Sequence, residues 1–424
     1  MSARRRVAIV DAYSSGRRLA PLFRERGFAC VHIRSTPVVP AVYAPSFVPG
    51  DFDAEIVHDG DPEKTAARVA EHEPVALIAG IESGVELADT LSETCGLRTN
   101  GSRLSSARRD KHRMMETVRE AGLRAARQFL TADEDALLAW YDTTIRAAAG
   151  DGRPARVVLK PVKSAGNDGV FFCDDADELR SAFRSLLGTD SALAIRNDEV
   201  LAQEYLFGGE YYVNTVSLDG VHQVCDIWKT SHINANGVRD LLDGAWLLDR
   251  HGPLQEKLTR YAFSVLDVLG IRHGPAHTEL KLTPDGPCLI ETGARLCGGD
   301  LPWLVRKAVG ESQLDWTADA YTDPERFRAR AGEPYAVREY VSSMSLIAPR
   351  SGTLLGYPRL EEVKALESFH EAKVSVNAGQ EIRRSVTDFT VPMLVDLAHP
   401  VQDVVLRDYA TVRYLDGEGF YDIA

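Results

Sequence analysis

Short apolar runs alternate with amphipathic segments over the first hundred residues. Val7–Val10 and Val75–Ala79 consist of aliphatic side chains, and Cys30–Ile33 is apolar except for His32, which predicts strands that are buried on both faces. Between the first two runs, Arg17–Arg26 has the apolar spacing of a helix. Strands that alternate with helices predict a parallel sheet covered by helices. We therefore expect a Rossmann-like domain over residues 1–110.

The middle of the chain, residues 111–325, mixes the two periodicities. Helical segments alternate with strands, and some strands are joined by short turns, as between Ala276–Leu282 and Cys288–Glu291. A polar stretch, Gly150–Pro154, has the composition of a hinge. It opens a segment of about 150–202 that we expect to act as a lid.

The last part of the chain, residues 326–424, contains short strands separated by glycine and proline. This pattern predicts a small α+β domain. The whole chain is thus expected to be a multidomain protein of α/β and α+β class.

Composition and charge restrict the class of protein. Of the 424 residues, 44% are hydrophobic and 26% are charged, which is ordinary for a globular enzyme and excludes a disordered or fibrous chain. The 62 acidic residues outnumber the 49 basic ones, and the net charge of -13 argues against nucleic acid as a partner. A phosphate-bearing small ligand stays compatible with this charge, because its pocket needs only a few basic groups.

No stretch of the sequence has the pattern of an export signal or a membrane span. The apolar run Val7–Val10 is shorter than the roughly 7–15 residues that a signal peptide needs. The longest apolar stretches, such as Val75–Ile81, are far below the roughly 20 residues that cross a bilayer. The cysteines form no C-x-x-C pair, which favours reduced, buried thiols. We predict a cytoplasmic protein without a membrane partner.

The first candidate for chemistry is the predicted strand that ends in Lys160. A loop of small residues, Ser164–Gly169, follows this lysine and leads into the next strand. Such a loop lets backbone N–H groups approach phosphate oxygens, while the lysine supplies positive charge. The loop lacks the G-K-[ST] ending of a P-loop, and G-x-G-x-x-G is missing after the first strand, so a dinucleotide site is weakly supported. A plain hairpin turn with an exposed lysine is the alternative.

The second candidate is the predicted hairpin between residues 276 and 291. In the expected register Glu279 faces Glu291 directly. Lys281 faces Leu289, and Ile290 lies on the core face. Because opposed carboxylates repel, a cation must compensate them. Lys281 is one candidate for this cation, and a hard divalent cation such as Mg²⁺ is the other.

Arg295 follows Glu291 by four residues and precedes Gly298–Gly299. An arginine beside a metal carboxylate can stabilise a transferring phosphoryl group. Paired glycines let a ligand approach the backbone closely. A surface salt bridge is the alternative role for Arg295.

In their order along the chain, these residues match a known family. They resemble the ATP-grasp superfamily of carboxylate–amine ligases, and the residues that carry the resemblance are Lys111, Lys160 with its loop, Gln203-Glu204-Tyr205-Leu206, Glu210, Glu279, Glu291 and Arg295. The match runs from about Ser105 to about Tyr321. Within the superfamily, His277–Lys281 and Glu291–Arg295 look most like the L-amino-acid ligases, which make dipeptides.

The resemblance implies a role for each of these residues. Lys111 and Lys160 would bind the α- and β-phosphates of ATP. The remaining nucleotide contacts would be Ser164, Gly166 and Asn167 over the outer phosphates, Gln203, Glu204 and Leu206 at the adenine, and Glu210 at the ribose. Glu279 and Glu291 would hold Mg²⁺, with Mn²⁺ as an alternative. Arg295, with Lys160, would act in catalysis by neutralising charge on phosphoryl and acyl-phosphate oxygens.

One position departs from the family pattern. Many members carry asparagine two residues after the second metal carboxylate, where this chain has Gly293. The metal would therefore have one ligand fewer, and tight binding of a second metal is not expected.

Candidate substrate residues follow from their positions. Glu82, at a strand end, could bind a substrate ammonium group or be an ordinary residue beside a helix start. His277 lies on the strand face of the first metal carboxylate and could contact a substrate carboxylate or be structural. Gly298–Gly299 leave room for a substrate. The polar segment Trp228–Gly237 is expected to be a covering loop, with a core position as the alternative for Trp228.

The function implied is an ATP-dependent ligase. It would join the carboxylate of one amino acid to the amine of another through an acyl phosphate, releasing ADP and phosphate. The expected partners are small amino-acid or peptide substrates, and a homodimer is compatible with the sequence. Two alternatives stay open: an ATP-grasp ligase of another substrate class, similar to glycinamide-ribonucleotide synthetase or biotin carboxylase, and a non-catalytic ATP-binding protein.

Overall fold

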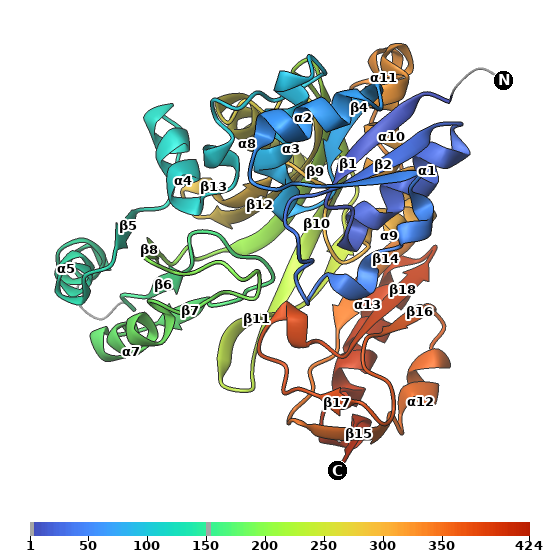
Figure 1. Ribbon diagram of the computed structural model, residues 1–424. Coiled ribbons are helices and arrows are strands. Elements are labelled where there is room, and N and C mark those ends of the chain that lie inside the picture. The colour runs from blue at the N-terminus through green and yellow to red at the C-terminus, as the bar shows by residue number, and fades with distance from the viewer. Residues whose placement is uncertain (1–3, 150–153) are drawn as a thin grey trace.

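The computed structural model describes residues 4–149 and 154–424. Its polypeptide forms an N-terminal α/β domain, a small four-stranded lid, and a large central sheet that continues into a C-terminal lobe (Figure 1). In Figure 1 the lid projects to the left of the central strands, and the C-terminal lobe lies at the bottom. No helix in the described residues is long and apolar enough to cross a membrane.

The N-terminal domain is the predicted parallel sheet. Its strands, in spatial order, are β3 (Ala54–Val57), β2 (Ala29–Arg34), β1 (Arg6–Val10) and β4 (Pro74–Ala79). Its helices are α1 (Leu19–Glu25), α2 (Pro62–Ala70) and α3 (Val85–Thr94). Successive residues of β1 enter different cores: Ala8 packs in the core that contains α2 and α3, and Val7 in the core that contains α1. This alternation confirms a sheet covered on both faces.

The lid sheet is antiparallel. Its strands, in spatial order, are β5 (Gln128–Thr131), β8 (Val200–Glu204), β6 (Val157–Lys160) and β7 (Phe171–Cys173). Its helices are α5 (Glu134–Trp140), a π-helical continuation at Tyr141–Arg146, α6 (Ala147–Ala149) and α7 (Ala176–Leu186). Because β5 pairs with β8, this sheet begins at Gln128, before the segment of about 150–202 that we expect to act as a lid. Residues 150–153 of the predicted hinge Gly150–Pro154 lie outside the described residues.

The central sheet joins the middle of the chain to the C-terminal lobe. Its strands, in spatial order, are β13 (Gly286–Gly293), β12 (Gly274–Thr283), β9 (Gly209–Leu218), β10 (Val221–Ala235), β11 (Val238–Leu247), β14 (Tyr340–Ser345), β18 (Met393–His399) and β16 (Phe369–Val374). The expected small domain at 326–424 therefore has no separate main sheet, because β14 pairs directly with β11. The helices beside this sheet are α4 (Lys111–Glu120), α8 (Pro253–Val268), α9 (Leu301–Val309), α10 (Gln313–Thr322) and α11 (Pro324–Arg330).

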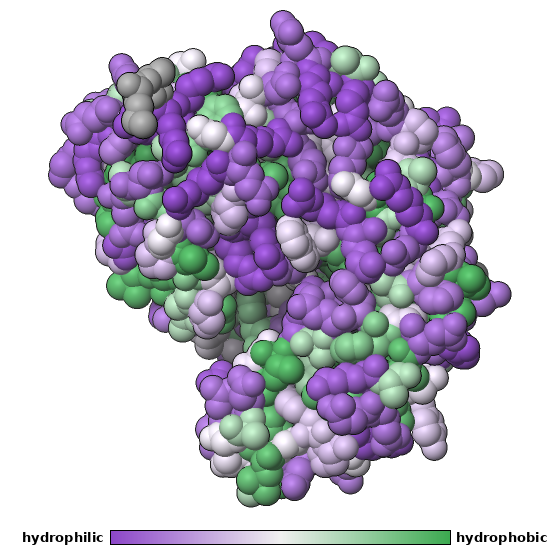
Figure 2. Space-filling model, turned by 90° about the vertical axis from the view of Figure 1, so that its right-hand side faces the viewer, coloured by the Kyte–Doolittle hydropathy of each residue, from purple (hydrophilic) through white to green (hydrophobic). Residues whose placement is uncertain are grey.

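The rest of the C-terminal lobe is small. It consists of α12 (Leu360–Lys364), α13 (Gln402–Leu415) and a sheet of β17 (Glu381–Ile382), β15 (Gly352–Gly356) and β19 (Asp422–Ile423). Figure 2 shows the face of the molecule where this lobe, at the bottom, meets the rest; the surface is mostly hydrophilic and is hollowed at the junction.

The prediction of a covering loop at Trp228–Gly237 is wrong. Most of this segment belongs to β10, which runs on through Ala235 and turns into β11. Trp228 is 0% exposed, and its indole N–H donates to Asp226 Oδ1 at 2.7 Å. The polar residues that suggested a loop instead sit on a strand of the central sheet.

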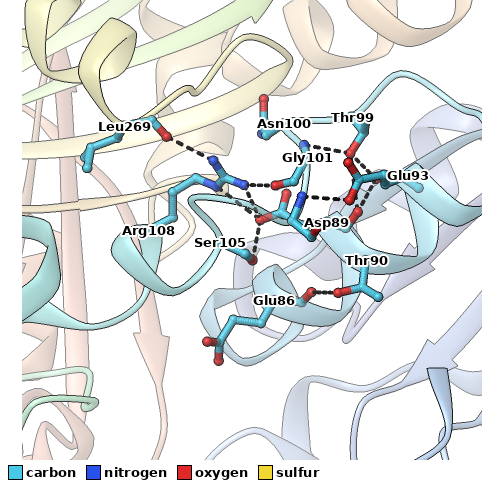
Figure 3. Close-up of polar contacts among 12 residues, drawn as sticks. Glu86, Asp89, Thr90, Glu93, Thr99, Asn100, Gly101, Ser105, Arg108 and Leu269 are labelled. Atoms are coloured by element: carbon cyan, nitrogen blue, oxygen red, sulfur yellow. Dashed lines mark hydrogen bonds and ion pairs between the residues drawn. The ribbon is translucent and has the colours of Figure 1, made fainter. Parts of the chain in front are cut away.

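A buried ion pair ties the N-terminal domain to the rest of the protein (Figure 3). Asp89 of α3 accepts hydrogen bonds from Arg108 Nε at 3.0 Å and from Ser105 Oγ at 2.6 Å. The same guanidinium donates to the carbonyl of Leu269, directly after α8, at 2.9 Å. Because a buried arginine needs partners for its charge and its donors, this contact fixes α3 against α8.

Candidate active site

Two cavities meet between the lid, the central sheet and the N-terminal domain. The first, of about 150 Å³, lies between the lid strands, the start of β9 and the second halves of β12 and β13. It is lined by all eleven residues expected to hold ATP and metal: Lys111, Lys160, Ser164, Gly166, Asn167, Gln203, Glu204, Leu206, Glu210, Glu279 and Glu291. The structure therefore brings together residues that are spread over nearly two hundred positions of the sequence.

The second cavity, of about 570 Å³, lies between the N-terminal domain and the C-terminal strands. It contains the residues expected on the substrate side: Glu82, His277, Arg295, Gly298 and Gly299. The two cavities share a wall made of Ala165, Gly166, Tyr212, Leu242, Glu279 and Asp388. This shared wall is the place where a nucleotide in one cavity would meet a molecule in the other.

Two lysines supply positive charge inside the first cavity. Lys160, at the end of β6, is 5% exposed. Burial and the nearby Lys111 ammonium lower the pKa of Lys160 to about 8. Lys111, the first residue of α4, donates to the carbonyl of Ser164 at 3.2 Å and pairs with Glu291 at 3.0 Å. Two buried ammonium groups side by side favour binding of a polyanion. The alternative of an exposed Lys160 on a plain turn is wrong.

The loop after Lys160 has a backbone that requires small residues. Gly166 and Asn167 have φ angles of +63° and +58°. A Cβ on Gly166 would lie 3.0 Å from the ring of Phe389, which belongs to the C-terminal lobe. The neighbouring Lys163 pairs with Glu86 of α3 at 3.0 Å. The loop is thus held closely by both the N-terminal domain and the C-terminal lobe.

Glu279 and Glu291 face each other across β12 and β13, as predicted. A bulge between Glu279 and Leu280 then shifts the register, so that Lys281 faces Cys288 and not Leu289. Leu289 is consequently a core residue, whereas Ile290 lines the first cavity. The other two expectations for this hairpin, Lys281 opposite Leu289 and Ile290 on the core face, are therefore wrong.

The prediction that Lys281 compensates the two carboxylates is also wrong. Lys281 Nζ instead lies 3.2 Å from Asp240 and 3.8 Å from Glu210. The partners of the carboxylate pair are Lys111, 3.0 Å from Glu291, and His277, 3.0 Å from Glu279.

The carboxylate pair fits magnesium only together with a phosphate ligand. Within residues 4–149 and 154–424, no group of three or more His, Cys, Asp or Glu side chains could hold a metal by itself. Mg²⁺ prefers oxygen ligands and is commonly held by one or two carboxylates plus substrate phosphates and water. Glu279 and Glu291, facing the same cavity as two lysines, match that donor set.

The predicted adenine hinge lies directly after β8. Both Glu204 side-chain oxygens are used within the protein: they accept from the backbone N–H of Arg127 at 2.9 Å and from its guanidinium at 2.7 Å. The hinge residues line the first cavity, and the side chain of Leu206 among them is buried. At the other end of the hinge, burial and the nearby Glu279 raise the pKa of Glu210 to about 8.

Arg295 is not a surface salt bridge, because its partner is buried at the domain boundary. Its Nε donates to Glu82 Oε2 at 2.7 Å, and Arg109 pairs with the other oxygen of Glu82 at 3.1 Å. Burial alone would raise the pKa of Glu82, but the two guanidiniums outweigh this effect and lower it to about 2. A Cβ on Gly293 would lie 2.6 Å from Glu82 Oε2, so the glycine that departs from the family pattern makes room for this pair.

The remaining predicted substrate residues lie around the second cavity. His277 has contacts at both ring nitrogens, with Asn214 at 2.7 Å and Glu279 at 3.0 Å. A Cβ on Gly298 or Gly299 would meet no atom within 4 Å, so both positions border open space. Contacts of Glu82 and His277 with a substrate stay predictions.

Several lining residues had not been predicted. They are Arg17 and Arg18, which both pair with Asp300, together with Tyr43, Asp240 and Asp388. The adjacent arginines after the first strand were visible in the sequence as basic residues at a parallel-sheet edge. Asp388 carried no such signal, because it comes from a lobe that was not expected to reach the site.

The chain resembles known proteins in sequence and structure. A sequence profile described as an ATP-grasp domain matches residues 153–302. Dapdiamide A synthase of Enterobacter agglomerans is 32% identical over 363 residues, which cover 84% of this chain and 83% of that protein. The L-arginine-specific L-amino acid ligase of Bacillus subtilis is 22% identical over 240 residues, or 55% of each chain.

Solved structures agree on the fold. The crystal structure of an L-amino acid ligase from Bacillus licheniformis matches with a TM-score of 0.73 at 18% identity, covering 100% of this chain and 99% of that one. Its similarity extends over all the domains described above. On these matches and on the two adjoining cavities, the chain belongs to the ATP-grasp superfamily of carboxylate–amine ligases and is similar to its L-amino-acid ligases.

Proposed function

We propose that this protein joins the carboxylate of one amino acid to the amine of another, using ATP and an acyl-phosphate intermediate. The observation that carries the proposal is the shared wall of the two cavities. One cavity has the lysines and carboxylates for a magnesium–triphosphate, and the other has the half-buried Arg295 and space for amino acids. The relatives that are amino-acid ligases support this substrate class.

The charged residues of the site would reduce the electrostatic repulsion between the two substrates. A carboxylate is an anion and a poor electrophile, so it must first receive the γ-phosphoryl group of ATP. The triphosphate and the carboxylate repel each other, and buried cations lower this repulsion most where water is excluded. Lys111 and Lys160 would hold the phosphates, with Glu279 and Glu291 as the metal ligands. Bound Mg²⁺ would supply further positive charge to the phosphate oxygens.

Arg295 is the group that we assign to the reacting carboxylate and phosphoryl oxygens. It lines the second cavity four residues after Glu291. Glu82, which also pairs with Arg109, holds Arg295 from the N-terminal domain side. We therefore assign Glu82 first as a positioning residue for Arg295, with the ammonium contact as its second role.

An acyl phosphate must be protected from water. The loop Ser164–Gly169 bridges the two cavities at Ala165 and Gly166, and it contacts both the N-terminal domain and the C-terminal lobe. The lid and its loop would close over the nucleotide and exclude water from the shared wall.

The test is ADP and phosphate release over a panel of amino acids, supplied singly and in all pairs with Mg²⁺ and ATP. Turnover that requires two amino acids, with a peptide as the product in mass spectrometry, is the expected result. Turnover with a single carboxylate and no amino-acid acceptor would indicate an ATP-grasp ligase of another substrate class. ATP binding without turnover on any carboxylate would indicate a non-catalytic protein.

A further inference from the structure

Asp388 is a carboxylate at the junction of the two cavities that the reaction described so far does not use. Of the six residues in the shared wall, only Glu279 and Asp388 carry carboxylates, and Glu279 is already assigned to the metal. Asp388 begins a short 3-10 turn, Asp388–Thr390, in the C-terminal lobe. Its side chain is exposed to the cavity.

Contacts from the other two domains hold Asp388 in this position. Its backbone N–H donates to the carbonyl of Gly166 at 3.2 Å, and its Oδ1 accepts from Asn167 Nδ2 at 3.3 Å. The next residue, Phe389, packs over Gly166 and lies 6.4 Å, ring centroid to ring centroid, from Tyr43 of the N-terminal domain. The carboxylate is therefore fixed to the loop that is expected to cover the phosphates.

The groups around Asp388 include several carboxylates, which favour an ammonium group at this position. The protein around this cavity position reduces the hydration of the Asp388 carboxylate and, together with the nearby Glu279, raises the pKa of Asp388 to about 6, against the lowering effect of the Asn167 hydrogen bond. Glu210 and Tyr212 of β9 face the same region. On the β16 side the cavity is lined by Glu371 and by Lys373, whose ammonium group pairs with Asp396.

We infer that Asp388 is a catalytic residue that binds the ammonium group of the acceptor amino acid and accepts its proton. The inference rests on the proposed function. An ammonium nitrogen has no free electron pair, so it must lose a proton before it can attack the acyl phosphate. A carboxylate at the shared wall stands where that nitrogen must approach the carbonyl carbon.

The step balances in atoms and charge. One proton passes from the ammonium group to Asp388, which becomes neutral. The amine nitrogen forms a bond to the carbonyl carbon, and the bond from this carbon to the phosphate oxygen breaks, with the electron pair leaving on oxygen. A second proton passes from nitrogen to the departing phosphate. The products are a neutral amide, hydrogen phosphate and protonated Asp388.

Other groups near the junction fit this task less well. Glu279 would have its oxygens on the metal. Burial raises the pKa of the Tyr212 phenol well above its ordinary value, so this group keeps its proton. Both ring nitrogens of His277 have partners within the protein.

The test compares two acceptors in the Asp388→Asn variant. Hydroxylamine is largely unprotonated at neutral pH and needs no base, and it traps an acyl phosphate as a hydroxamate. With an amino-acid acceptor we expect kcat to fall about 100- to 10,000-fold, the usual contribution of a general base. Hydroxamate formation should stay within about threefold of the unmodified enzyme, since the acyl phosphate still forms.

The pH profile provides a second readout. Peptide formation by the unmodified enzyme should rise with pH through an ionisation near 6, and this limb should be absent in Asp388→Asn. Asp388→Glu should restore part of the rate, because it restores a carboxylate.

Comparison of the two products separates a chemical role from a structural one, because Asp388 also contacts the loop through Asn167. If Asp388 only holds the loop, Asp388→Asn should lose peptide and hydroxamate formation alike, and that result would overturn the inference. An unchanged rate of peptide formation in Asp388→Asn would overturn it as well. Failure of the unmodified enzyme to form either product would instead overturn the proposed function, and an unchanged thermal unfolding midpoint shows that the variants are folded.

Discussion

Arg295 donates from Nε to Glu82 Oε2 at 2.7 Å and so joins the ATP-grasp body to the N-terminal domain at the substrate cavity. Glu82 is 2% exposed, and its other oxygen lies 3.1 Å from Arg109. This buried carboxylate pairs with two guanidiniums, and its removal would leave both without this partner.

We therefore expect Glu82→Gln to lower kcat more than it changes the KM for ATP. The amide keeps the shape of the side chain but loses its charge, so Arg295 would move away from the reacting oxygens, with a loss of roughly 10- to 100-fold. Leaving the buried Arg109 and the half-buried Arg295 without their shared carboxylate should also reduce the free energy of unfolding by about 3 kcal/mol. Steady-state ADP release and chemical denaturation measure the two effects.

Glu362→Gln is the control for this variant, because Glu362 pairs with Arg359 on the surface at 2.9 Å. Exposed pairs contribute about 0–1 kcal/mol, so this change should leave kcat unaltered. A Glu82→Gln enzyme with the kcat of the unmodified protein would show that Glu82 does not position Arg295.

Gly293→Ala should reproduce the defect of Glu82→Gln. The added Cβ would stand 2.6 Å from Glu82 Oε2 and 3.1 Å from Arg295 Nε, so the pair must separate. Because both changes act on one contact, the double variant should lose little more activity than either single variant. Gly356→Ala, where a Cβ meets no atom within 4 Å, is the matched control. Additive losses in the double variant would contradict this account.

ATP binding should weaken as the pH rises through about 8. Lys160 is the group responsible, because burial and Lys111 lower its pKa to about 8 in the free protein. The triphosphate favours the protonated ammonium, so binding raises this pKa, and above pH 8 the complex must take up a proton to form. Calorimetric titration with ATP in two buffers of different ionisation enthalpy would detect this proton uptake. Lys160→Arg, which stays charged, should abolish the uptake; if the uptake persists in that variant, another group is responsible.

Glu291→Ala should leave the fold intact and abolish ATP turnover. The side chain is one of the two carboxylates assigned to Mg²⁺, and it also pairs with Lys111. Activity should not return at high Mg²⁺ concentration, because a single remaining carboxylate holds the ion too weakly at the phosphates. Circular dichroism checks the fold and ADP release checks turnover. Normal ADP release by this variant would contradict the metal assignment.

Local patterns were enough to predict the elements around the site. The apolar runs of β1, β2 and β4 and the helices between them follow from residue type and spacing, which act over a few neighbours. The Lys160 loop and the pairing of Glu279 with Glu291 are also local, since each lies within one hairpin. The order of the family motifs along the chain then predicts which ligand each of these residues binds.

Contacts between distant segments decided the rest. The bulge after Glu279 moves Lys281 away from the carboxylates, and it depends on how β12 packs against both neighbours. The polar residues after Trp228 form a strand because β11 pairs with them, which outweighs their loop-like composition. Asn167 and Asp388 are 221 residues apart and meet only because β14 extends the central sheet into the C-terminal lobe. The burial that lowers the pKa of Lys160 and the cavity wall that raises the pKa of Asp388 exist only after these segments have packed together.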